Sequence, residues 1–139
     1  MNFIKKLFET KSHKTGIVFI VEDNTAYAKT LAAFIRTSFS AVKEVAIFPV
    51  GETCITELDR NPDLIIMDYF LDTRYTDAET GLEIIKQIRA MRPEMNILLL
   101  SSQKDVDIML ETIRTYKCSY VKKDEKTFER VEEILKEAL

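Results

Sequence analysis

Short apolar runs alternate along this chain with longer stretches in which apolar residues recur every three or four positions. Several of the short runs are continuously apolar, which is typical of strands that are buried on both faces of a sheet. Five runs therefore predict strands, at residues 17–21, 44–48, 64–67, 96–100 and 119–122.

The stretches between these runs have the period of amphipathic helices. Polar residues also mark helix ends: Asn24 is a candidate N-cap, Thr80 and Glu83 fit a capping box, and Asp124 stands where it could cap the last helix. The apolar stripes comprise Tyr27, Leu31, Phe34 and Ile35; Ile84, Ile88 and Met91; Val106, Met109, Leu110 and Ile113; and Phe128, Val131, Ile134 and Leu135.

Strict alternation of strands and helices predicts an α/β fold of five βα units. Such a pattern implies a doubly wound parallel sheet that is covered by helices on both faces, with right-handed crossovers. In sheets of this kind, ligands bind beyond the carboxyl ends of the strands. The residues that follow each strand are therefore the candidates for function.

Composition supports a single globular domain. The chain has 139 residues, of which 46% are hydrophobic and 31% charged, as in soluble globular proteins. A net charge of −3 gives no electrostatic reason to expect a nucleic-acid partner. Cys54 and Cys118 lack metal-ligand spacing and are interpreted as core thiols in a reducing cytoplasm. No apolar stretch approaches the ~20 residues that span a bilayer.

Residues 1–16 form a leader ahead of the predicted domain, residues 17–139. The leader lacks the continuous apolar region and cleavage site of a secretory signal. Two interpretations stay open: a frayed terminus, or a short amphipathic helix that docks through one apolar face. That face would carry Phe3, Ile4, Leu7 and Phe8.

Chemically active side chains follow four of the predicted strands. Three are carboxylates, two are hydroxyls and one is an ammonium group. Clustered carboxylates repel one another, and a hard divalent cation such as Mg²⁺ relieves that repulsion. One of the acids could then act as a nucleophile toward phosphorus, because phosphoryl transfer needs mainly positioning and positive charge. These residues are Glu22, Asp23, Asp68, Ser101, Ser102 and Lys123.

The chain resembles the receiver domain of two-component response regulators over residues 17 to 138. The stretches that carry the resemblance are IVFIVED, DLIIMD, ILLLSS and SYVKKD, in this order on five βα units. The resemblance implies a flavodoxin-like (βα)₅ fold with strand order 2-1-3-4-5. It also implies that Asp68 accepts a phosphoryl group from a phosphohistidine donor.

The resemblance assigns further roles around Asp68. Asp23 would bind Mg²⁺ directly together with Asp68, Glu22 would bind it through water, and the backbone carbonyl of Phe70 would be another ligand. Ser101 would contact the phosphoryl group and Lys123 would pair with it, although Lys122 is an adjacent alternative. Ser101 and Tyr120 would form the switch that reports phosphorylation. Ser102, Phe70 and Gln103 fall at positions that contact the phosphoryl group or tune dephosphorylation.

Three features depart from the usual receiver pattern. Asp72 replaces a common proline four residues after the acceptor, and Asp124 follows the lysine where proline is more frequent. Residues 72–80, DTRYTDAET, are longer than usual and add three acids. This segment could alter metal affinity, gate the phosphodonor or bind a partner.

The resemblance implies a stand-alone cytoplasmic signalling protein rather than an enzyme acting on external substrates. Its partners would be a sensor histidine kinase or histidine phosphotransfer protein and a downstream protein target. Self-association would use the face formed by the helix around 106–113, strand 119–122 and the helix around 128–135. Two alternatives remain: a pseudo-receiver that docks a partner without phosphorylation, and an aspartyl-nucleophile phosphatase. The phosphatase is disfavoured because position 70 is phenylalanine rather than a second aspartate.

Overall fold

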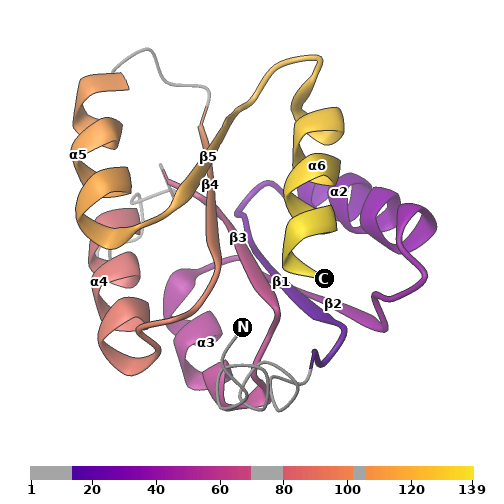
Figure 1. Ribbon diagram of the computed structural model, residues 1–139, viewed down its shortest axis with the longest axis horizontal. Helices are drawn as coiled ribbons and strands as arrows, with labels where there is room; N and C mark the ends of the chain where they lie inside the picture. Colours follow the sequence, from indigo (N-terminus) through magenta and orange to yellow (C-terminus); the bar gives the residue numbers. More distant parts are fainter. Residues whose placement is uncertain (1–13, 70–79, 102–105) are drawn as a thin grey trace, which may run out of the picture.

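The computed structural model describes residues 14–69, 80–101 and 106–139 of the chain (Figure 1). The apolar face suggested for residues 3–8 therefore lies outside the described residues, as do most residues of the 72–80 segment. Among the described helices, none is both long and apolar enough to cross a bilayer.

Five parallel strands form one sheet in the order β2-β1-β3-β4-β5, as the resemblance implies. Labels follow Figure 1, in which the first described helix is α2. The elements are β1 (Ile17–Val21), α2 (Thr25–Ser38), β2 (Glu44–Phe48), α3 (Gly51–Thr56), the 3₁₀ helix η1 (Leu58–Arg60), β3 (Leu64–Asp68), α4 (Gly81–Met91), β4 (Ile97–Ser101), α5 (Val106–Tyr116), β5 (Ser119–Lys122) and α6 (Thr127–Ala138).

Two strand boundaries differ from the sequence prediction. β3 extends through Asp68, which pairs with Leu100, and β4 runs one residue later than predicted, ending at Ser101. The prediction stopped each strand before its polar residue. A parallel ladder is made of backbone hydrogen bonds, so a polar side chain at its end does not terminate it. Asp68 and Ser101 are consequently held by the sheet itself.

The sheet is the middle layer of three. α3, α4 and α5 lie on one side of it, and α2 and α6 lie on the other (Figure 1). Successive residues of β3 alternate between the two cores: Ile65 and Met67 pack under α3–α5, whereas Leu64 and Ile66 pack under α2 and α6. This double burial explains why the strand sequences are continuously apolar.

The predicted helix starts are confirmed at two of three positions. The Asn24 side chain accepts the Tyr27 N–H at 3.0 Å, and Thr80 and Glu83 form the reciprocal capping box at the start of α4. The prediction for Asp124 is wrong: the N-cap of α6 is Lys126. Asp124 instead accepts the Lys126 N–H at 2.8 Å and so shapes the turn before the helix.

Gly81 opens α4 in close contact with the end of β3. A Cβ atom at this position would overlap the carbonyl oxygen of Tyr69, the residue after Asp68. Glycine is therefore required for the backbone to approach this closely. The start of α4 therefore lies directly against the residue that follows β3.

Arg89 joins the ends of α4 and α5. Its guanidinium donates to the carbonyl oxygens of Tyr116 (3.0 Å), Pro93 (2.8 Å) and Met95 (2.7 Å). Tyr116 is the last residue of α5, where the carbonyls lack partners within the helix, and Pro93 and Met95 lie in the turn after α4. Arg89 therefore supplies donors to both segments.

We expect Arg89→Ala to lower the free energy of unfolding by about 2–3 kcal/mol, because it removes two partly buried hydrogen bonds and further exposed ones at once. The matched control is Arg92→Ala, at the end of the same helix. The Arg92 side chain donates to the adjacent Met91 carbonyl at 3.3 Å. Its loss should cost within about 0.5 kcal/mol. Urea denaturation compares the two variants, and equal losses would contradict the role given to Arg89.

Candidate functional site

Backbone hydrogen bonds extend the sheet by one residue beyond three strands and so fix the direction of the chain at its carboxyl edge. Each of these N–H groups donates to a carbonyl of the neighbouring strand. The bonds are Glu22 N–H to Phe48 (3.0 Å), Tyr69 N–H to Leu100 (3.0 Å) and Lys123 N–H to Ser101 (2.9 Å). The side chains of Glu22 and Lys123 are therefore placed by rigid elements.

Three carboxylates converge at this edge, as the sequence predicts. One oxygen from each of Glu22, Asp23 and Asp68 lies within 4.8 Å of the others. Glu22 is only 3% exposed, the Asp68 side chain is 14% exposed, and Asp23 is exposed at the mouth. We call these three residues the acid cluster. Its burial increases from Asp23 inward to Glu22, so ligands can approach Asp68 from the Asp23 side.

Lys123 forms ion pairs with two residues of the acid cluster. Its Nζ donates to Glu22 Oε1 at 2.6 Å and to Asp68 Oδ2 at 3.1 Å. Lys122, the alternative in sequence, is exposed and pairs in register with Ser101. Burial lowers the pKa of Lys123, but the carboxylates of Glu22 and Asp68 outweigh it and raise the pKa above its usual value. The ammonium group therefore stays charged.

Glu22 is the residue of the acid cluster whose ionised form is disfavoured by burial. Burial, followed by its contact with the neighbouring Asp68 carboxyl, raises the pKa of Glu22 to about 7. Its Oε2 atom is buried and has no hydrogen-bond donor among the described residues. A buried carboxylate oxygen without a donor is costly and favours either a proton or a cation.

The acid cluster fits a hard divalent cation. With all groups ionised, three carboxylates and one ammonium leave a net charge of −2. All donors are oxygens, one of them lacks a partner, and the exposed Asp23 leaves room for water. Mg²⁺ prefers this combination, because it binds a few carboxylates and retains several waters.

The structure places the two predicted switch residues at the sheet. Ser101 is fully buried at the end of β4, and Tyr120 on β5 is partly buried against the core under α3–α5. The sites predicted at Phe70, Ser102 and Gln103 lie outside the described residues. The roles assigned to all five residues stay predictions.

Sequence reasoning missed Tyr27, whose ring lies beside Lys123. The Lys123 Nζ is 4.5 Å from the centroid of this ring. Tyr27 belongs to an apolar helical stripe, and such a stripe predicts a core residue. Its place in the first turn of α2, shortly after the acids that follow β1, was the signal that could have placed it near the acid cluster.

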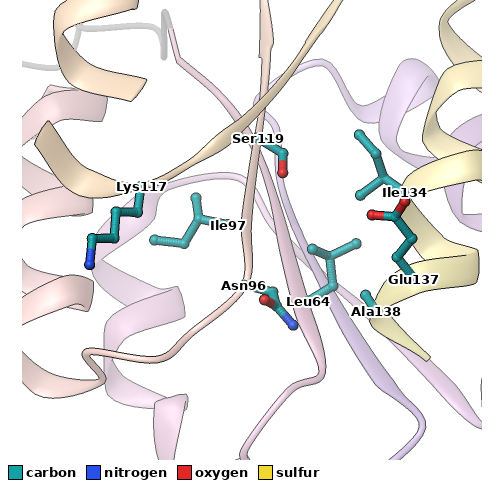
Figure 2. A pocket seen from close by; sticks show the side chains of 8 residues that line it. All are labelled: Leu64, Asn96, Ile97, Lys117, Ser119, Ile134, Glu137 and Ala138. Atoms are coloured by element: carbon teal, nitrogen blue, oxygen red, sulfur yellow. The ribbon is translucent and has the colours of Figure 1, made fainter. Parts of the chain in front are cut away.

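A separate hollow of about 270 Å³ opens at the opposite edge of the sheet (Figure 2). Leu64, Ile97 and Ser119, which line it, are the first residues of β3, β4 and β5. Figure 2 shows Ile134 and Glu137 of α6 facing this hollow, while Lys117 points away from it. The hollow is one strand length from the acid cluster and is not part of the candidate site.

The family model described as "Response regulator receiver domain" matches residues 18–136, nearly the whole chain. This chain belongs to the response regulator receiver family. For a receiver domain, phosphorylation-based signalling in two-component systems is the general role, and kinases and downstream effectors are the general kinds of partner.

Solved structures show the same receiver fold. The receiver domain of NtrX from Brucella abortus has a TM-score of 0.74 and 19% identity, over 88% of this chain and 97% of that one. A CheY-like receiver from Methanospirillum hungatei has a TM-score of 0.71 and 18% identity, covering 91% and 94%.

DrrB, an OmpR/PhoB homolog from Thermotoga maritima, has a TM-score of 0.69 and 21% identity over 86% of this chain. This receiver domain spans only 50% of the DrrB chain. No match is found among curated proteins.

Proposed function

We propose that this receiver domain accepts a phosphoryl group on Asp68 from the phosphohistidine of a sensor histidine kinase or a histidine phosphotransfer protein. The observation that carries the proposal is the contact of one ammonium group, Lys123, with both Glu22 and Asp68 at the edge where Asp23 is exposed. The proposed setting is the cytoplasm, in keeping with the unpaired thiols of Cys54 and Cys118.

In the proposed reaction, a carboxylate oxygen of Asp68 forms a bond to phosphorus while the donor's P–N bond breaks and its imidazole leaves. Lys123 already contacts Asp68 Oδ2 at 3.1 Å and can pair with an oxygen of the arriving phosphoryl group. Asp23 and Asp68 would hold Mg²⁺ directly and Glu22 through water, with the Phe70 carbonyl as a further ligand. When bound, Mg²⁺ supplies positive charge to the phosphoryl oxygens.

The chain would act only on itself, catalysing its own phosphoryl transfer and dephosphorylation rather than turning over an external substrate. A pseudo-receiver that docks a partner without phosphorylation is the alternative. The complete set of three acids and a lysine supports the phosphorylated receiver, since each group serves the transfer reaction.

Output would pass through protein contacts. Ser101 and Tyr120 would form a two-state element, in which the hydroxyl moves toward the phosphoryl group and the tyrosine fills the space that it leaves. The face formed by α5, β5 and α6 would then change and bind a downstream target or a second copy of the chain.

The test is incubation with Mg²⁺ and phosphoramidate followed by intact mass spectrometry. We expect a hydroxylamine-sensitive phosphate adduct on the wild type in the presence of Mg²⁺. The adduct should not form when EDTA removes the Mg²⁺, and it should not form in Asp68→Asn, because the nucleophile is then absent. Asp59→Asn, an exposed acid on η1, is the control and should retain the adduct.

Two outcomes contradict the proposal. A wild type that stays unmodified with every competent phosphodonor would favour the docking module. An adduct that persists in Asp68→Asn would place the acceptor at another residue.

A further inference from the structure

Tyr27 lies against Lys123 in a cation–π contact. The ammonium nitrogen is 4.5 Å from the centroid of the tyrosine ring, within the ~6 Å over which such contacts are attractive. Lys123 is therefore held from two sides, by carboxylates of the acid cluster and by the face of an aromatic ring.

The Tyr27 ring is itself fixed by an aromatic group between α2 and α6. Its centroid is 6.2 Å from that of Phe128 in an edge-to-face arrangement, and the Phe128 ring packs at a tilt of 31° against Phe34, with centroids 5.0 Å apart. The Tyr27 backbone N–H is bound by the Asn24 cap at the start of α2. The ring therefore has little freedom to move away from Lys123.

The carboxylates and the ring differ in what can compete for them. Glu22 and Asp68 are the groups that a divalent cation would also bind, so a cation in the acid cluster draws them away from the ammonium. The ring is neutral and is not a ligand for a hard cation. Its hold on Lys123 would persist when the carboxylates are occupied.

We infer that Tyr27 is a positioning residue that keeps the Lys123 ammonium over Asp68 while the acids bind a cation. The inference rests on the proposed function for its effect on phosphoryl transfer. A lysine side chain has a flexible four-carbon stem, so without the ring it would sample more conformations and meet the phosphoryl group less often.

Three substitutions separate positioning from packing. Tyr27→Phe keeps the ring face and removes only the hydroxyl. Tyr27→Leu keeps apolar volume and removes the ring face. Phe34→Leu causes a packing loss in the same aromatic group, but Phe34 contacts Phe128 rather than Tyr27, so the contacts of the Tyr27 ring with Phe128 and Lys123 are kept.

The first measurement is the rate of phosphorylation by phosphoramidate at saturating Mg²⁺, as a function of phosphoramidate concentration. In Tyr27→Leu we expect the maximal rate constant to fall roughly 2- to 30-fold, the range that corresponds to one cation–π contact. Tyr27→Phe and Phe34→Leu should stay within about twofold of the wild type. A rate in Tyr27→Leu equal to that of the wild type would overturn the inference.

The second measurement does not depend on phosphorylation. In metal-free protein and again with Mg²⁺, the NMR signals of the Lys123 ε-CH₂ group, which is bonded to Nζ, should be shifted upfield by the ring. The shift should remain in Tyr27→Phe and vanish in Tyr27→Leu. Wild-type shifts that vanish when Mg²⁺ is added would also overturn the inference.

The two measurements separate this inference from the proposed function. A wild type that takes up no phosphoryl group defeats the proposed function, and the NMR comparison then decides alone whether Tyr27 holds Lys123. A wild type that is phosphorylated while Tyr27→Leu matches it leaves the proposed function intact and defeats the inference.

Discussion

Lys123→Met should lower the free energy of unfolding of the metal-free receiver domain by roughly 2–4 kcal/mol at pH 8. The substitution removes the ammonium that donates to Glu22 and Asp68, and it leaves a carboxylate that is 3% exposed without a partner. The loss of stability has an upper limit, because Glu22 can take up a proton and become neutral once the ammonium is gone. Urea denaturation in EDTA measures the effect.

Lys122→Met provides a matched control, since the neighbouring lysine is exposed and forms no ion pair with the residues that the structure describes. We expect its effect to stay within about 0.5 kcal/mol. The double variant Glu22→Gln/Lys123→Met should recover most of the lost stability, because the unpaired buried charge is gone. Equal losses from the two lysines would show that Lys123 does not neutralise the acid cluster.

Glu22→Gln should make the metal-free protein more stable above pH 7 and remove part of its pH dependence. The pKa of Glu22 is raised from 4.5 to about 7 in the folded state, first by burial and then by Asp68. The folded protein therefore holds this proton more tightly than the unfolded chain, and its stability falls as pH rises from about 4.5 to 7. The difference corresponds to roughly 2–4 kcal/mol.

The measurement is the free energy of unfolding of the wild type and Glu22→Gln in EDTA between pH 5 and 8. The gap between them should widen with pH and level off above 7. Glu94→Gln, an exposed acid in the turn before β4, should follow the wild type. A constant gap across this range would mean that Glu22 is not the titrating group.

The sequence was sufficient to predict the parallel sheet and the proximity of Glu22, Asp23 and Asp68 at its carboxyl edge. Continuous apolar runs indicated strands buried on both faces, and a parallel sheet brings the carboxyl ends of its strands to one edge. Glu22 and Asp68 could therefore be placed together although 46 positions separate them along the chain. Backbone topology alone determines this proximity.

Contacts that depend on side-chain direction were not predictable in the same way. Tyr27 lies on an apolar stripe, and nothing in the periodicity distinguishes a core ring from one that faces an ammonium group. The reach of Arg89 to carbonyls at the end of α5 likewise depends on how two helices end next to each other. The strand ends at Asp68 and Ser101 depend on backbone hydrogen bonds between strands, which the apolar pattern does not show.

The close contact of Gly81 with Tyr69 bears on how this protein could diversify. Residues 70–79 connect these two points, and the connection begins two residues after the proposed acceptor. Lengthening a connection between fixed points costs only about 0.6 kcal/mol per doubling. New recognition sequences could therefore be grafted at this junction, and the acids and lysine beneath it would be left in place.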